Sequence, residues 1–235
     1  MEKLILCGRN SVFDAIDNNF QIEKIFISYE NIKLLQKLSH TKIKIEKKSK
    51  QFLDNMTKEN HQGIIAILKF FPIYDINTFF NDKPSNILIL DHIQDPHNLG
   101  AIIRTANAFG IKHIIIPKDR SADITATVLK ISSGGFIDIK IAKVANISAV
   151  IKKLKEHNYW IFATALSEKA ITLEKVKFNE KNVLIVGNEE KGISLPVLKM
   201  SDQVIYIKQF GKVQSLNVSV ATGILLYELT KENNC

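Results

Sequence analysis

Residues 91–110 read DHIQDPHNLGAIIRTANAFG and directly follow the apolar run ILIL at residues 87–90. An apolar run, a polar loop and a helical pattern, in that order, are typical of a strand that leads into a helix. Asp95 is a good helix N-cap, Pro96 suits the first helical position, and Gly110 suits a left-handed cap after the last turn. We therefore expect a strand at 87–90 and a helix at 96–109.

The expected helix has one apolar face and one open face. Its core face is formed by residues at helical spacing, namely Leu99, Ile102, Ile103, Ala106 and Phe109. Arg104 lies on the other side, and the residues one turn away from it, Gly100, Ala101 and Ala108, are all small. Such cleared surroundings suit a large polar ligand that lies against the helix beside Arg104.

Beyond this stretch, residues 86–235 alternate strand and helix patterns. Strands are expected at 87–90, 113–116, 138–142, 160–165, 183–186 and 204–207, and helices at 96–109, 124–131, 148–157 and 218–231. This alternation predicts an α/β fold in which a mostly parallel sheet carries helices on both faces. Ligands of such sheets collect at the carboxyl ends of the strands, which should draw together the loops after Leu90, Ala165, Val186 and Ile207.

Residues 1–68 are expected to form a smaller α/β domain, joined to the large one by a linker at 69–85. A helix is predicted at 11–16, with strands at 22–27 and 63–68. The linker contains two prolines, and its phenylalanines should pack partly against a domain. The segment KIKIEKKSK at 42–50 has two interpretations, an edge strand protected by lysines or a patch that contacts RNA phosphates, and the sequence leaves both open.

The composition is that of an ordinary globular protein, with 46% hydrophobic and 24% charged residues. The net charge of +8 fits a nucleic-acid partner, although many lysines alone would give the same value. The two cysteines, Cys7 and Cys235, are too few for a disulfide framework or a zinc site, so we expect no metal and a reducing cytoplasmic compartment. The first residues contain neither a secretory signal nor a membrane span.

The spacing of the glycines argues against the common nucleotide-binding motifs. In the loop after the strand at 183–186, Gly187 and Gly192 have Walker A spacing, but Ile193 stands where that motif requires lysine. No glycine triplet supplies a dinucleotide fingerprint either, so nucleoside triphosphates and NAD are excluded, and the loop alone could be a simple surface turn.

Near the end of the chain, Ser215 or Asn217 can cap a helix with a buried stripe of Leu216, Val220, Ile224 and Tyr227.

Together these three stretches resemble the SpoU family of RNA ribose 2′-O-methyltransferases, of the SPOUT class. The motifs are Asp95-Pro-His-Asn98-Leu-Gly100 with Arg104, Val186-Gly-Asn-Glu189 through Gly192, and Ser215-Leu-Asn217-Val-Ser. The resemblance is closest to the branch that methylates a guanosine of 23S ribosomal RNA. It rests there on Gly8-Arg-Asn10, on His61-Gln-Gly63 and on Pro117-Lys-Asp-Arg-Ser121.

The resemblance implies a C-terminal trefoil knot, a homodimer, and an S-adenosylmethionine site made largely of backbone groups. The cofactor-binding residues it implies are Thr164, Ala165, Leu166, Gly187, Gly192, Ile207, Ser215, Leu216 and Val218. The catalytic residues it implies are Asn98, Arg104, Glu189, Ser215 and Asn217. The small domain would bind RNA, either 23S ribosomal RNA or an assembly intermediate of it. DNA is not an expected partner, since only RNA has the 2′-hydroxyl.

Arg104 has two candidate roles, general base or phosphate clamp. A guanidinium is always protonated and accepts no hydrogen bond, which favours a clamp that also stabilises the developing alkoxide. Asn98, Ser215 and Asn217 would orient the ribose, and Glu189 would position Arg104 or the RNA. Two other functions stay open, a transfer-RNA ribose methyltransferase and an RNA-binding module of this fold without transferase activity.

Overall fold

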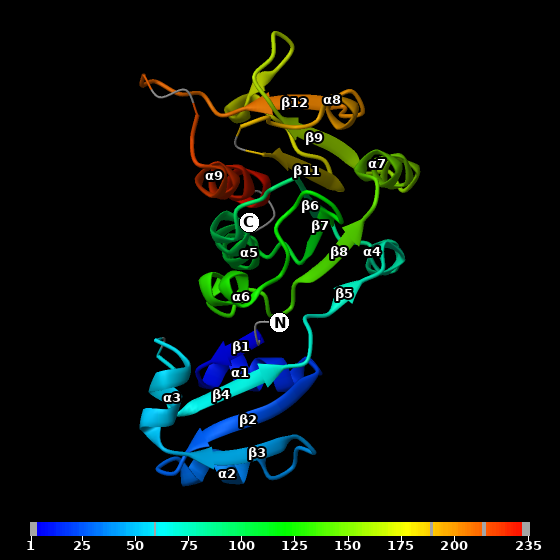
Figure 1. The fold of residues 1–235 in the computed structure, drawn as a ribbon. Coiled ribbons are helices and arrows are strands. Elements are labelled where there is room, and N and C mark those ends of the chain that lie inside the picture. The colour runs from blue at the N-terminus through cyan, green and yellow to red at the C-terminus, as the bar shows by residue number, and fades with distance from the viewer. Residues whose placement is uncertain (1–3, 59, 189, 213–214, 232–235) are drawn as a thin grey trace.

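The computed structural model describes residues 4–58, 60–188, 190–212 and 215–231, and they form two sheets (Figure 1). The small sheet has the strand order β1 (Leu4–Cys7), β4 (Ile64–Leu68), β2 (Ile22–Ser28) and β3 (Lys44–Lys48). Only β2 and β3 are parallel, and β3 lies at the edge. The helices of this unit are α1 (Arg9–Asp17), α2 (Ile32–Leu38) and α3 (Lys50–Met56).

The large sheet has eight strands, and every neighbouring pair is parallel. Its order is β10 (Ile171–Thr172), β12 (Gln203–Tyr206), β9 (Trp160–Thr164), β11 (Asn182–Gly187), β6 (Asn86–Asp91), β7 (His113–Pro117), β8 (Lys140–Val144) and β5 (Ile73–Tyr74). A short 3-10 turn, η1 (Leu173–Lys175), follows β10. A sheet in which every strand pair is parallel needs helices packed on both of its faces.

Helices cover both faces of the large sheet, as the sequence predicted (Figure 1). One layer contains α5 (Pro96–Ala108), α6 (Ala126–Ser132) and α9 (Val218–Thr230), and the other contains α4 (Ile76–Asp82), α7 (Ile147–Glu156) and α8 (Leu195–Leu198). Alternate residues of β6 enter the two cores: Leu88 and Leu90 pack with α5, and Ile87 and Ile89 pack with α7. The α/β fold class is thereby confirmed, whereas the trefoil knot stays a prediction.

Helix α5 begins and ends where its cap residues predict. The Asp95 carboxylate accepts the His97 N–H at 2.9 Å, Pro96 is the first helical residue, and Gly110 has a φ of +73°. The predicted core face is buried, with Phe109 only partly covered. Capping and apolar periodicity agree in this helix, so its position follows from the local sequence.

The interpretation of Gly100 as open space for a ligand is wrong. A Cβ at Gly100 would lie 2.8 Å from the Ile131 Cβ and 2.9 Å from the Val128 carbonyl oxygen. Glycine is therefore required here because α6 packs closely on α5.

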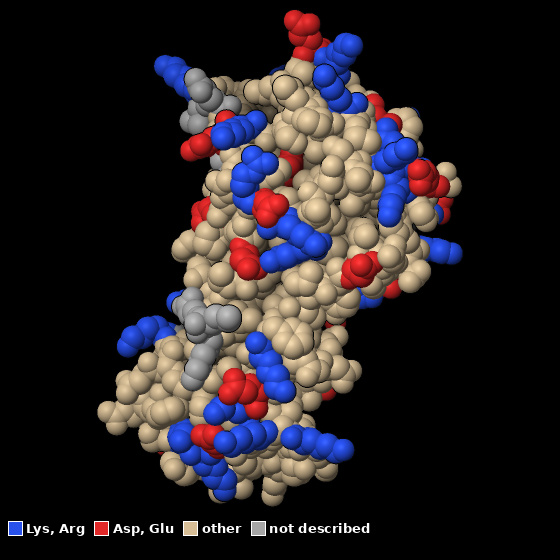
Figure 2. Space-filling view, turned by 45° about the vertical axis from the view of Figure 1, so that its right-hand side comes forward, with Lys and Arg blue, Asp and Glu red and all other residues tan. Residues whose placement is uncertain are grey.

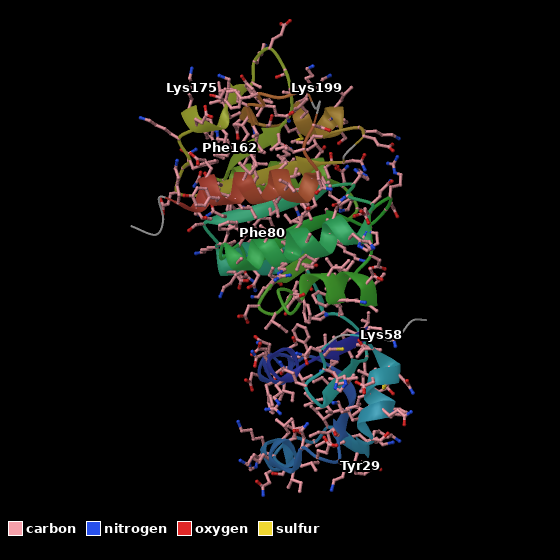
Figure 3. The ribbon with its side chains drawn as sticks, turned by 90° about the vertical axis from the view of Figure 1, so that its left-hand side faces the viewer. Tyr29, Lys58, Phe80, Phe162, Lys175 and Lys199 are labelled. Atoms are coloured by element: carbon pink, nitrogen blue, oxygen red, sulfur yellow. The ribbon has the colours of Figure 1, made fainter. Side chains whose placement is uncertain are left out.

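The predicted buried stripe of α9 is also wrong. Val220 is 52% exposed and Tyr227 is 59% exposed, and Leu216 and Ile224 are exposed as well. The buried residues belong to a different face, formed by Val218, Thr222, Leu225, Leu226 and Leu229. Because α9 is apolar on nearly all sides, helical spacing could not choose between the two stripes. Figure 3 shows α9 lying beside α5 on the outer side of the molecule.

Residues 69–85 contain structure that the sequence did not predict, because they include β5 and α4. Strand β5 pairs with β8, and Phe79 of α4 is fully buried. Phe71 packs between Phe20 of the small unit and Phe136 of the large one, with ring centroids 5.9 and 6.0 Å away. These rings fix the two units to one another. In the described part of the chain, no helix is long and apolar enough to span a bilayer.

Candidate active site

Strands β12, β9, β11 and β6 are consecutive neighbours in the sheet, so the loops that follow them meet at one edge, as predicted. A cavity lies at the ends of β9, β11 and β12, closed on one side by the start of α9. All nine residues expected to bind the cofactor line this cavity: Thr164, Ala165, Leu166, Gly187, Gly192, Ile207, Ser215, Leu216 and Val218. Residues from four separate segments therefore meet in a single site.

The cavity has an apolar floor and a neutral lining. The floor is formed by Val186, Ile205, Val218, Ala221 and Leu225, which come from two strands and α9. The polar side chains in the lining are those of Thr164, Asn188, Tyr206, Gln209 and Ser215, and none of the described lining residues carries a formal charge. Such a surface accepts a flat apolar group, and its specificity must come from backbone N–H and carbonyl groups at the strand ends.

The loop between β11 and α8 forms one wall of the cavity and is a tight turn. Asn188 and Gly192 exchange two backbone hydrogen bonds of 3.1 and 2.9 Å, and the Asn188 side chain accepts the Glu190 N–H at 2.9 Å. Gly192 has a φ of +64°. A Cβ at Gly187 would lie 2.3 Å from the Gly192 carbonyl carbon, so only glycine permits this turn. Glu189 lies outside the described residues.

Two of the predicted catalytic residues contact each other directly. The Asn217 side-chain amide donates to the Asn98 Oδ1 at 3.0 Å, linking the start of α9 to the first turn of α5. Asn217 is also the N-cap of α9, because its Oδ1 accepts the Ser219 N–H at 2.9 Å. Ser215 lies in the cavity lining two residues earlier. The polar groups of α5 and α9 are thus held at the cavity edge by a defined network.

In the single chain, Arg104 does not lie in the cavity. It lies exposed on α5, and it is not among the residues that line the cavity. A Cβ at Gly135 would lie 2.7 Å from the Arg104 Cα, so this glycine lets the loop after α6 pass close behind the arginine backbone. The guanidinium is therefore presented on the exposed side of α5, outside the cavity.

Sequence reasoning missed a link among the loops at this edge. The Asp91 carboxylate, at the end of β6, accepts the Ser194 N–H at 2.7 Å and lies 2.6 Å from the His92 Nδ1. The Asn188 side chain donates to the His92 carbonyl oxygen at 3.0 Å. A signal existed, because Asp91 is a charged residue directly after a fully apolar strand. Its partner lies 103 residues away, however, and no local pattern identifies it.

Comparisons with known proteins agree over the whole chain. Residues 85–227 match the model of the SpoU rRNA Methylase family, and residues 5–74 match the model for RNA 2′-O ribose methyltransferase substrate binding. A relative from Staphylococcus haemolyticus, whose name places it in the TrmH family of tRNA/rRNA methyltransferases, is 34% identical. That alignment covers 100% of this chain and 98% of the relative.

Two solved structures show the same architecture. An rRNA methyltransferase from Sinorhizobium meliloti, solved with AdoMet bound, has a TM-score of 0.85 at 24% identity, covering 98% of this chain and 88% of that one. The TrmH/SpoU tRNA modifying enzyme of A. aeolicus is 34% identical with a TM-score of 0.59, covering 64% of this chain and 76% of that one. The fold similarity thus extends over both units in the first case and over part of the chain in the second.

Proposed function

Because this chain belongs to the SpoU family of RNA methyltransferases, we propose that it transfers a methyl group from S-adenosylmethionine to the 2′-hydroxyl of a ribose in RNA. The observation that carries the proposal is the cavity at the carboxyl edge of the large sheet, where the second and third motifs meet. The Asn98–Asn217 hydrogen bond adds polar groups at its edge.

The cavity fits S-adenosylmethionine by the chemistry of its lining. The apolar floor suits the face of an adenine ring, and the absence of formal charge on the described lining residues leaves nothing there to repel a sulfonium cation. The strand-end segments at Thr164–Leu166, Gly187–Gly192 and Ile207, together with the start of α9, would hold it, mostly through backbone groups. When bound, this cofactor supplies an electrophilic methyl carbon.

The side chains of this enzyme align and stabilise the RNA hydroxyl. Asn98, Asn217 and Ser215 would orient the ribose, and the hydrogen bond between Asn98 and Asn217 holds these two side chains in one arrangement. A guanidinium is a donor only, so Arg104 would bind the phosphate of the target nucleotide and stabilise negative charge on the attacking oxygen. Glu189 would position Arg104 or the RNA.

A substitution at Gly187 tests whether the turn shapes the cofactor cavity. Gly187→Ala is expected to lower S-adenosylmethionine affinity at least about tenfold and the melting temperature by several degrees, because overpacking costs about 1–3 kcal/mol. Calorimetric titration and thermal melting measure the two effects. Gly211→Ala is the matched control, since a Cβ there would meet nothing within 4 Å. Unchanged affinity in Gly187→Ala would show that the cofactor binds elsewhere.

The proposed substrate is a guanosine of 23S ribosomal RNA. The segments Gly8–Asn10, His61–Gly63 and Pro117–Ser121 support this branch, whereas the tRNA/rRNA names of the relatives fit a transfer-RNA target equally well. Mapping ribose methylation in ribosomal and transfer RNA from cells with and without the gene decides between the two. A site lost from 23S RNA alone supports the proposal, and no lost site would favour an RNA-binding module without transferase activity.

We propose that the small unit, residues 1–68, binds RNA and that residues 86–235 catalyse the methyl transfer. Residues 69–85 would connect the two. The family match at residues 5–74 supports this division. The lysine cluster at 42–50 is less available than its sequence suggests. Glu46 on the edge strand β3 forms ion pairs with Lys24, Lys44 and Lys48, at 3.5, 3.2 and 3.4 Å. Hydrogen bonding from Lys44 is the main cause that lowers the pKa of Glu46.

Figure 2 shows the consequence: carboxylates lie among the basic side chains over the lower, small unit. The lysines of this cluster that do not pair with Glu46 are Lys42, Lys47 and Lys50. These three are the better candidates for phosphate contacts.

Charge reversal tests the lysine cluster. The triple variant Lys42→Glu, Lys47→Glu and Lys50→Glu is expected to weaken RNA binding at least about tenfold and to flatten the salt dependence, by about 0.7 in log–log slope for each lost contact to single-stranded RNA. Fluorescence anisotropy over a salt series measures both quantities. Reversal of Lys152, Lys175 and Lys177, exposed on the large unit, is the control. An unchanged slope would leave β3 as an edge strand protected by lysines.

We propose a homodimer that uses the exposed apolar stripe of α9. Val220, Ile224 and Tyr227 form this stripe, and α9 packs beside α5, the helix that carries Arg104 (Figure 3). A stripe of three large apolar side chains on one helix is typical of a surface that a partner covers.

A further inference from the structure

A second cavity lies on the other side of the Asn188–Gly192 turn, and the proposed function assigns it no role. Three loops meet there, those after β6, β7 and β11. His92 and Gln94 come from the first loop, Arg120 from the second, and Lys191 with Ser194 from the third. Asn188 and Gly192 line both cavities, so the two sites share one thin wall.

His92 is held in a fixed orientation at this cavity. Its Nδ1 lies 2.6 Å from Asp91, a carboxylate that is only 1% exposed and that also accepts the Ser194 N–H at 2.7 Å. An ionised carboxylate can only accept, so the Nδ1 of His92 carries the hydrogen. In the tautomer with its hydrogen on Nδ1, Nε2 has a lone pair that can accept a hydrogen bond from a ligand in the cavity.

Two of the lining residues have backbone conformations that side chains rarely adopt. His92 has a φ of +61° and Arg120 a φ of +52°, and they belong to different loops. For a residue other than glycine, such a conformation is strained, and strain of this kind is concentrated at functional sites. Glycine at either position would remove this strain, which indicates that these side chains contribute something other than stability.

The cavity also gathers positive charge. Arg120 and Lys191 are exposed, and no ion pair joins either of them to a carboxylate among the residues the structure describes. Glu190 is the one acidic residue in the described lining. The Gln94 amide donates to the Arg120 carbonyl oxygen at 3.4 Å and ties the first two loops together. Two cationic heads beside one hydrogen-bond acceptor match a phosphate next to a hydroxyl.

We propose that this cavity binds the RNA nucleotide adjacent to the methylated one, with Arg120 and Lys191 on its phosphate and the His92 Nε2 accepting from its 2′-hydroxyl. This inference rests on the proposed function, because the second nucleotide would lie across the Asn188–Gly192 turn from the cavity in which methyl transfer takes place. It assigns His92 a specificity role: a 2′-deoxy nucleotide offers no hydroxyl there. The enzyme would thus recognise RNA at the flanking nucleotide as well as at the target.

Two substitutions compatible with the backbone test the proposal. His92→Gly and Arg120→Asn suit positive φ values, so both variants are expected to fold. His92→Gly should melt below the wild type, because it removes a partner of the buried Asp91 carboxylate. Lys175→Ala is the control, since this exposed lysine lines neither cavity (Figure 3). The probes are a mixed-sequence single-stranded RNA 12-mer and the DNA 12-mer of the same sequence, measured by fluorescence anisotropy, with S-adenosylmethionine affinity from calorimetry.

Each substitution has its own expected signature. Arg120→Asn should weaken RNA and DNA binding alike, about five- to tenfold, and flatten the salt slope by about 0.7, which is the mark of a lost phosphate contact. His92→Gly should reduce the preference for RNA over DNA about fivefold, the effect of one net hydrogen bond, while the salt slope stays unchanged. Neither change should alter S-adenosylmethionine affinity.

The proposal is overturned if His92→Gly prefers RNA over DNA as strongly as the wild type does. It is also overturned if the variant loses S-adenosylmethionine affinity together with its RNA preference, because the His92 ring would then have only a structural role. Failure of the proposed function looks different. Wild-type protein would then transfer no tritiated methyl group to ribosomal or transfer RNA from cells lacking the gene, whatever the two variants bind.

Discussion

Replacing Arg104 by alanine is expected to reduce methyl transfer at least about 100-fold while S-adenosylmethionine affinity changes less than about twofold. The guanidinium lies outside the cofactor cavity, so its removal leaves the apolar floor and the strand ends intact. What is lost is charge stabilisation at the reacting oxygen, and removing one such donor typically costs a factor of about 100–1000 in rate.

Tritiated-methyl incorporation and calorimetry measure the two halves of this prediction. Arg104→Lys separates charge from shape, because an ammonium keeps the charge but cannot make a bidentate contact with phosphate. It should restore only part of the transfer. Lys130→Ala, an exposed cation on the neighbouring helix α6, serves as the control. Substantial transfer by Arg104→Ala would eliminate the proposed role of this residue.

The contrast between α5 and α9 shows where local sequence suffices. In α5 the caps and the apolar spacing agree: Asp95 and Gly110 mark the ends, and the polar positions leave one possible core face. In α9 the structure selects Asn217 from the two predicted caps, Ser215 and Asn217, but apolar residues surround the helix. Which stripe is buried then depends on α5 and β11, and that information is not present in the α9 sequence.

Close packing and long-range links were the other features that the sequence could not provide. Gly100 is small because Ile131 lies against it, and β5 forms because β8 offers an edge. The Asp91–Ser194 hydrogen bond joins loops that are distant in the chain. Motif resemblance, by contrast, selected nine residues that all lie in the lining of one cavity, because the carboxyl ends of neighbouring parallel strands must meet. Arg104 was expected at that site, yet its own chain leaves it outside.

The position of Arg104 bears on the α9 surface. An exposed arginine on the helix that packs against α9 is suited to a site that a second copy completes, since a partner that covered Val220, Ile224 and Tyr227 would lie next to α5. Placing carboxylates in that stripe should therefore separate the subunits, because a buried unpaired charge costs several kcal/mol.

The double variant Val220→Asp and Tyr227→Asp is accordingly expected to be monomeric and to lose methyl transfer at least about 100-fold. Both side chains are more than half exposed, at 52% and 59%, so the fold of a single chain should tolerate the change, as circular dichroism would show. Sedimentation velocity measures the assembly state. The matched control is Ile32→Asp, which alters an apolar side chain that is 65% exposed on α2 and should stay dimeric and active. If the double variant is monomeric but fully active, each chain contains a complete site and Arg104 acts within its own subunit. If the wild type is itself monomeric, the exposed stripe of α9 is not a dimer surface.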